Sequence, residues 1–200
     1  MTLYNQILLR MVDVMETVKT FNQSGQVNNV VDLVEAIVST YQRGGTVFIC
    51  GNGGSHADAL HFAEELTGRF KKNRRPLGAL ALGEATHTTC VGNDYGFDHI
   101  FSRQLAGLAN PADMLIGLST SGLSTNVIYA IRQAQDMGLR KYALLGKNGG
   151  DLGGMLEAHE KLIVQSDTTE RIQELHMTLL HIAIEMVERR LFPELYRETT

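Results

Sequence analysis

The stretch Thr46-Val-Phe-Ile-Cys50 runs directly into Gly51-Asn-Gly-Gly-Ser55, and this succession decides the fold prediction. A short run of apolar and β-branched residues predicts a strand that is buried on both faces. The glycine-rich loop then opens a helical pattern that continues to Phe70. The same order recurs at Asp113–Leu118, which is followed by Ser119-Thr-Ser-Gly-Leu-Ser124 and a helical pattern to about Met137.

Three further apolar runs predict strands at residues 77–82, 141–145 and 161–164, and the first of them ends in a polar loop. A helical pattern then occupies residues 168–191. Short strands that alternate with helices predict an α/β fold, in which helices cover both faces of a parallel sheet. Ligands of such sheets bind beyond the carboxyl ends of the strands, where the glycine- and serine-rich loops are expected to lie.

Two amphipathic helical patterns, at residues 3–18 and 27–41, precede the first strand and lie outside this alternation. Their apolar residues recur at steps of three and four, as on one face of a helix. Gly44-Gly45 ends the second pattern. These helices could cover the sheet or pack against another subunit, and the pattern favours neither alternative.

Length and composition exclude several classes of protein. At 200 residues, one domain is expected. The net charge of −4 argues against a broad nucleic-acid surface, and the lack of Trp argues against a stacking platform for single strands. No run approaches the ~20 apolar residues of a membrane span, and the N-terminus lacks the apolar segment of a signal peptide. A cytoplasmic protein with no membrane association is expected, with Cys50 and Cys90 as buried, reduced thiols.

The first loop, Gly51–Ser55, has the features of an anion site. Glycine lets the backbone approach an anion closely, and a helix N-terminus offers free N–H groups. The loop is not a Walker loop, since no Gly-Lys-Ser/Thr follows, and His56 occupies the third glycine position of the dinucleotide fingerprint. The alternative is a tight turn in which Ser55 caps the helix.

The second loop, Ser119–Ser124, holds four hydroxyl groups around one glycine. Hydroxyls and backbone N–H groups can hold a phosphate without Lys or Arg. The alternative is a serine-rich turn in which Ser124 or Thr125 caps the following helix. Because neither loop supplies a cation, the ligand expected here is a phosphomonoester of a small molecule.

Acid, base and metal-binding groups lie on two of the predicted helices. His61 and Glu65 are four residues apart and therefore share one helix face. Such a pair can bind a metal ion, or it can act as a base with an orienting partner. The alternative is a solvated helix face, where such pairs are also common. His181 sits in an apolar stretch, where a lone histidine is more often a core residue. Gln173 and His181 are separated by roughly 12 Å along a helix axis. Both could serve one site only through an irregular helix start or a neighbouring subunit.

Four segments, taken together and in order, resemble the motifs of phosphoheptose isomerases, also called sedoheptulose 7-phosphate isomerases, of the sugar isomerase (SIS) domain superfamily. They are residues 50–70, 92–96, 116–122 and 169–176, and the likeness runs from about residue 3 to 193. The resemblance implies a three-layer αβα sandwich with a five-stranded parallel, flavodoxin-like sheet. It implies a single SIS domain over residues 1–200, with an N-terminal helical segment at 1–43 and an α/β core at 46–193. It also implies a homotetramer with active sites between subunits.

The resemblance implies an aldose–ketose isomerase that converts sedoheptulose 7-phosphate to D-glycero-D-manno-heptose 7-phosphate through an enediol, as the first step of nucleotide-activated heptose biosynthesis. Glu65 and His181 are the implied acid/base pair. The implied zinc ligands, in members that bind zinc, are His61, Glu65, Gln173 and His181. The implied contacts of the phosphorylated seven-carbon sugar are Asn52, Gly53, Gly54, Ser55, Glu65, Arg69, Asn93, Asp94, Ser119, Thr120, Ser121, Ser124 and Gln173.

Some positions depart from the family pattern, and they bear on substrate preference rather than on the type of reaction. They are His56, Leu60, Glu84, Leu123, Thr125, Leu145 and Glu170.

An alternative function is that of a non-catalytic SIS-domain regulator, which binds a replication initiator protein or senses a phosphosugar. A regulator of the first kind is expected to lack the histidine at position 181, which this chain retains.

Overall fold

A computed structural model describes residues 1–197 of the chain. Five strands form one parallel sheet in the order β2-β1-β3-β4-β5. All five predicted strands are confirmed, within a residue or two at their ends. Their bounds are β1 Val47–Gly51, β2 Ala79–Ala81, β3 Met114–Ser119, β4 Arg140–Gly146 and β5 Lys161–Val164.

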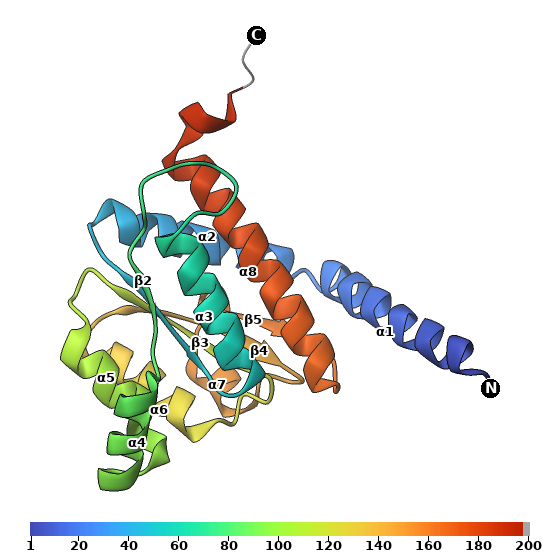
Figure 1. Ribbon diagram of the computed structural model, residues 1–200, viewed down its shortest axis with the longest axis horizontal. Helices are drawn as coiled ribbons and strands as arrows, with labels where there is room; N and C mark the ends of the chain where they lie inside the picture. Colours follow the sequence, from blue (N-terminus) through green and yellow to red (C-terminus); the bar gives the residue numbers. More distant parts are fainter. Residues whose placement is uncertain (198–200) are drawn as a thin grey trace.

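Helices cover both faces of the sheet, so the predicted three-layer α/β fold is confirmed (Figure 1). Helices α2, α3 and α8 pack on one face, and α4 to α7 pack on the other. The bounds are α1 Leu3–Gln23, α2 Val27–Gln42, α3 Gly54–Thr67, α4 Ala85–Asp94, α5 Ile100–Leu108, α6 Thr125–Asp136, α7 Gly150–Met155 and α8 Thr169–Leu191. Three short 3-10 turns lie at Phe97–His99, Ala158–Glu160 and Pro193–Tyr196.

Successive residues of the central strands enter opposite cores, as the two-residue period of a strand requires. Ile49 and Ile116 lie opposite each other on β1 and β3 and face α2, α3 and α8. Cys50 and Leu115 belong to the core beneath α5 and α6. Cys90 is exposed, so the predicted burial is confirmed for Cys50 and wrong for Cys90. Because both faces are buried, these strands appear in the sequence as continuous apolar runs.

The two leading helices behave differently from each other. Helix α2 buries seven residues, Leu33 and Ile37 among them, and so covers the sheet as one of the two alternatives predicted. Helix α1 buries only Phe21 and projects away from the α/β body (Figure 1). For α1 the expectation of a sheet cover is therefore wrong, because its apolar face meets solvent.

The segment after β2 is helical rather than the polar loop expected from the sequence. Helix α4 begins after Glu84, whose carboxylate accepts hydrogen bonds from the backbone N–H groups of Thr86 and His87. Helix α5 follows and contributes Phe101 and Leu105 to the core. Within residues 1–197, every helix is too short or too polar to cross a membrane.

Candidate active site

The glycine-rich loop after β1 turns sharply into α3. Gly53 has φ 54° and is the residue before the helix, so a side chain at this position would be strained. Ser55 does not cap α3, which makes the predicted capping role wrong; it lies within the helix and is buried. Its hydroxyl lies 3.5 Å from Gln173 Nε2 of α8. A Cβ added at Gly54 would lie 2.6 Å from Gln173 Oε1, so a larger residue here would displace the Gln173 amide from the loop.

The hydroxyl-rich loop after β3 is organised around its own side chains. Ser119 Oγ accepts a hydrogen bond from Gly122 N at 3.0 Å and lies 3.0 Å from Ser124 Oγ. Ser121 Oγ accepts from Leu123 N at 3.1 Å. Ser124 occupies the N-cap position of α6, but its side chain makes no capping bond, so the predicted capping role is wrong. Val127 N donates to Asn126 Oδ1 at 3.0 Å, which leaves the N–H groups before it at the start of α6 for an anion.

The two loops are tied to each other at the carboxyl edge of the sheet. Asn52 Nδ2 donates to Asn126 Oδ1, and Asn126 Nδ2 donates to Asn52 Oδ1, both at 2.8 Å. Asn126 is buried at the start of α6. This reciprocal amide pair fixes the glycine loop relative to the hydroxyl loop, as a shared ligand site requires.

A carboxylate between two imidazoles lies where α3 packs against α8. Glu65 Oε1 is 3.4 Å from His61 Nε2, and Glu65 Oε2 is 3.4 Å from His181 Nε2. One ligand atom from each of these three residues lies within 4.8 Å of the others. The His181 side chain is 36% exposed, so the alternative of a core histidine is wrong for this residue.

Burial is the main influence on the protonation of Glu65. Its side chain is only 13% exposed, and desolvation raises the pKa of the carboxyl above its usual range, whereas the nearby imidazoles of His181 and His61 oppose that rise. Glu65 Oε2 is buried and has no hydrogen-bond partner among the described residues. A carboxylate with a raised pKa and a free oxygen is suited to accept a proton.

His176, one turn before His181, is the core histidine of this helix. It is fully buried, and its Nε2 lies 3.0 Å from the carbonyl oxygen of Leu145. Burial lowers its pKa to about 4, so it is neutral at physiological pH. The two histidines of this stretch therefore lie on different sides of α8. His176 is buried in the core, and His181 contacts Glu65 of α3.

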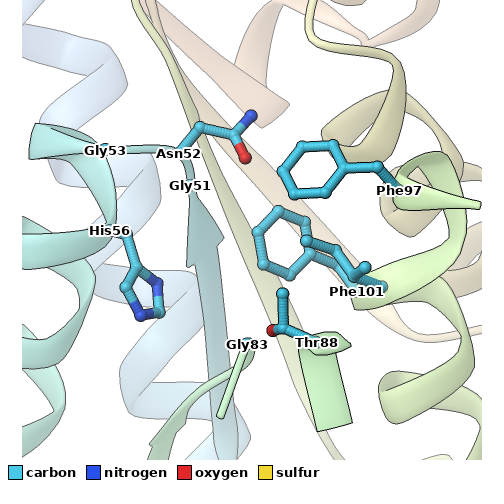
Figure 2. Close-up of a pocket in the computed structure, with 9 residues that line it drawn as sticks. Gly51, Asn52, Gly53, His56, Gly83, Thr88, Phe97 and Phe101 are labelled. Carbon is cyan, nitrogen blue, oxygen red and sulfur yellow. The ribbon is translucent and has the colours of Figure 1, made fainter. Parts of the chain in front are cut away.

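A pocket of about 190 Å³ opens beside the glycine loop. Figure 2 shows the rings of Phe97 and Phe101 across this pocket from the Gly51–Gly53 backbone and His56. His56 Nδ1 and Thr88 Oγ1 are buried near it without hydrogen-bond partners among the described residues. His56, a departure from the family pattern, thus lies beside the predicted sugar contacts Asn52 and Gly53.

Comparison with known proteins agrees with this geometry. The family model of the SIS domain matches residues 10–146. The chain is 49% identical to a phosphoheptose isomerase of Fusobacterium nucleatum over 166 residues, which cover 83% of this chain and 84% of that protein. The chain belongs to the phosphoheptose isomerase family of SIS-domain proteins.

Solved structures of this family have the same fold. A phosphoheptose isomerase from Neisseria gonorrhoeae superposes with a TM-score of 0.87 at 36% identity, covering 94% of this chain and 99% of that one. A phosphoheptose isomerase from Francisella tularensis gives a TM-score of 0.88 at 34% identity, with 94% and 100% covered. The resemblance stated from four sequence motifs is thereby confirmed across nearly the whole chain.

The structure brings together only part of the residue set implied by the phosphoheptose isomerase family. His61, Glu65 and His181 form one cluster, and Gln173 lies two turns earlier on α8, beside Ser55. Because α8 is helical from Thr169, the irregular helix start considered for Gln173 is wrong.

Three other implied contacts of the phosphoheptose isomerase family lie on the surface of this chain. Asn93 and Asp94 are exposed at the end of α4, where Asn93 Nδ2 donates to Asp94 Oδ1 at 2.8 Å. Arg69 is exposed after α3, and within residues 1–197 its side chain makes no hydrogen bond. These three side chains are free to meet a ligand or a second copy of the chain.

Two residues that contact the candidate site are not marked by any spacing in the sequence. Asn126 follows the hydroxyl loop at the start of α6 and links the two loops. Phe70 closes the first motif and stacks on the His181 ring, with centroids 5.8 Å apart. Both contacts join segments distant in the sequence, so only the fold reveals them.

Proposed function

We propose that this chain is an aldose–ketose isomerase that converts sedoheptulose 7-phosphate to D-glycero-D-manno-heptose 7-phosphate, the first step of nucleotide-activated heptose biosynthesis. The observation that carries the proposal is the contact between Glu65 of α3 and His181 of α8, two helices whose N-terminal ends meet at the glycine loop. Its relatives of 40–49% identity bear the name phosphoheptose isomerase.

The hydroxyl loop is proposed to bind the phosphate. The hydroxyls of Ser119, Thr120, Ser121 and Ser124, together with the first N–H groups of α6, would neutralise the anion without a cationic side chain. A phosphate held at a fixed point positions the reacting carbons at the far end of the sugar. The proposed contacts along the sugar are Asn52, Gly53, Gly54, Ser55, Arg69, Asn93, Asp94 and Gln173.

Glu65 is proposed as the base of the reaction. Its carboxylate removes a proton from C1 of the ketose, which gives a cis-enediol as O2 takes up a proton from His181. The carboxyl group then returns a proton to C2, and His181 accepts the proton released from O1 as the aldehyde forms. Both residues end in their starting protonation states, so no oxidant or reductant is consumed.

The cluster of His61, Glu65 and His181 has a donor set that fits zinc, since two imidazole nitrogens and a carboxylate oxygen are ordinary ligands of that ion. The unpartnered Glu65 Oε2 supports this fit. When bound, zinc would act as a Lewis acid that polarises the carbonyl and hydroxyl oxygens. Gln173 is the proposed fourth ligand, and it would join the set from a second copy of the chain, because it lies two turns from His181 on the same helix.

A homotetramer with active sites between subunits is proposed as the working assembly. Support comes from the apolar face of α1, on which Leu3, Ile7 and Met11 are all more than half exposed. A second apolar surface, with Val31 and Ile182, lies at the outer side of α2 and α8. Sedimentation at four times the 22.1 kDa chain mass would support the tetramer, and a monomer would contradict it.

The division of the chain into an N-terminal helical segment, residues 1–43, and an α/β core, residues 46–193, is kept as a proposal within one SIS domain. A cytoplasmic location is likewise proposed. Support for the location comes from the class of substrate and from the two cysteines, Cys50 and Cys90, which are free thiols.

A coupled assay of sedoheptulose 7-phosphate isomerisation, run with zinc and with a chelator, tests the proposal. We expect turnover with zinc, a loss of activity with the chelator, and recovery when zinc is restored. Absence of turnover with zinc supplied would contradict the isomerase proposal. Binding of the phosphosugar without turnover would instead support a non-catalytic regulator.

A further inference from the structure

The segment between α3 and β2, residues 68–78, is a strap that runs across to the C-terminal half of α8 (Figure 1). Its two ends are joined by a hydrogen bond from Leu77 N to the carbonyl oxygen of Leu66 at 2.9 Å. Helix α3 carries Glu65 and α8 carries His181, so the strap bridges the two helices of the proposed acid/base pair.

A buried ion pair anchors the strap to α8. Arg74 Nε donates to Glu188 Oε1 at 2.9 Å, and neither side chain has any exposed surface. The same guanidinium donates to the carbonyl oxygen of Leu66 at 2.7 Å and to that of Glu65 at 2.8 Å. Tyr196 Oη donates to the other oxygen of Glu188 at 2.7 Å. Arg74 thus binds the backbone of Glu65 and a residue of α8 at once.

The strap also contacts the His181 side chain directly. The Phe70 ring stacks on the imidazole of His181, with an angle of 13° between the ring planes and 5.8 Å between the centroids. Lys71 forms an ion pair with Glu185, one turn beyond His181 on α8. The His61 ring meets His181 edge-on at 5.1 Å. The imidazole therefore has an aromatic neighbour on its face and another at its edge.

We infer that the strap is a positioning element, in which Phe70 orients the His181 imidazole toward Glu65 and Arg74 fixes the spacing of the helices that carry them. The inference rests on the proposed isomerase function for its kinetic readout. A flat aromatic face restricts the rotation of a stacked ring, whereas an aliphatic side chain of similar volume does not. Because the phosphate loop lies on other elements, changing Phe70 or Arg74 while Arg69 is kept should lower kcat far more than it raises KM.

Variants at Phe70 test the stacking contact. Phe70→Leu is expected to lower kcat roughly 10- to 100-fold, the size of effect that a misplaced catalytic group produces, with KM within about twofold. Phe70→Tyr keeps the ring and is expected to stay within about threefold of the wild-type kcat. The control is Phe192→Leu, the same change at a half-buried phenylalanine that packs against the same core without contacting His181. Equal kcat values for Phe70→Leu and Phe192→Leu, or equal loss in Phe70→Tyr and Phe70→Leu, would overturn the inference.

Variants of two neighbouring arginines test the anchor. Arg74→Lys keeps the charge beside Glu188 but cannot make all the hydrogen bonds of the guanidinium, so kcat should fall. Arg75→Lys is the matched control, because Arg75 is exposed. If Arg74→Lys and Arg75→Lys both retain the wild-type kcat, the anchoring role is wrong.

A readout that is independent of turnover separates this inference from the proposed function. The ring ¹H and ¹³C signals of His181, assigned by comparison with His181→Asn and recorded at one pH, carry the ring-current shift of Phe70. We expect these signals to move in Phe70→Leu and in Arg74→Lys, and to stay in place in Phe192→Leu and Arg75→Lys. Unmoved signals in the first two variants would overturn the inference, even if the wild type turns over no heptose phosphate.

Discussion

Gly122 lies at the centre of the proposed phosphate loop, and replacing it with alanine should damage that loop specifically. Its φ of 68° lies in the left-handed region. A Cβ added there would lie 1.9 Å from the carbonyl oxygen of Gly149 and 2.8 Å from Gly150 N. Both obstructing groups are backbone, so the loop itself must move to admit the methyl group.

The size of the effect follows from these two conflicts. A left-handed conformation costs a residue other than glycine roughly 1–2 kcal/mol. Overpacking adds typically about 1–3 kcal/mol. The free energy of unfolding should therefore fall by about 2–5 kcal/mol, and at about 2–4 °C per kcal/mol Tm should fall by roughly 4–20 °C. A displacement of about 1 Å at the phosphate should reduce kcat/KM about 100-fold.

Thermal unfolding and steady-state kinetics of Gly122→Ala measure both effects. The control is Gly107→Ala in α5, where no atom lies within 4 Å of the added Cβ. That variant should be stabilised by roughly 0.5–1 kcal/mol, because alanine loses less entropy than glycine in a helix, and its KM should not change. The reasoning is refuted if Gly122→Ala keeps the wild-type Tm and KM.

Three further predictions concern groups whose protonation is set by the fold. Glu65→Gln should lower kcat by about 10²–10⁴-fold while phosphosugar binding, measured by calorimetry, persists; near wild-type activity would exclude Glu65 as the base. Because burial raises the pKa of Glu65, NMR titration of its carboxyl in the metal-free protein should show a pKa above the usual ~4.3 of a glutamate, and a pKa at or below that value would contradict this. Burial lowers the pKa of His176 to about 4, against about 6.5 when unfolded, so the stability linked to its neutral form is complete above pH ~6.5 and is lost as the pH falls toward 4. Tm should therefore depend less on pH in His176→Gln than in the wild type over that range, and identical slopes would refute the assignment.

Much of the fold follows from periodicity in the sequence. The strands beginning near Val47 and Met114 are buried on both faces, so their apolar runs are continuous and their ends are marked by glycine or serine. Helix α4 was missed because it buries only Val91, and a helix with one buried residue has no apolar stripe to detect. Helix α1 has such a stripe, but periodicity does not say whether the partner of an apolar face lies in the same chain.

The candidate site was predictable where its residues are neighbours in the sequence. His61 and Glu65 share a helix face, and the hydroxyls of Ser119–Ser124 share a loop. The remaining contacts join distant segments, as when His181 meets Glu65 or Asn126 meets Asn52. Those pairings depend on how α3, α6 and α8 pack at one edge of the sheet, which spacing along the chain does not encode. The role of His181 was predicted from the family resemblance, whereas the contacts of Asn126, Phe70 and Arg74 are visible only in the structure.

The central claim is that Glu65, held against His181, moves a proton between C1 and C2 of a phosphosugar whose phosphate is bound by the hydroxyl loop. The most direct test is the conversion of sedoheptulose 7-phosphate in D₂O, followed by NMR for the wild type and for Glu65→Gln with zinc supplied to both. The account predicts a heptose 7-phosphate that carries solvent deuterium at C2 with the wild type, and no product above background with the variant. No conversion by the wild type, or equal conversion by both proteins, would contradict it.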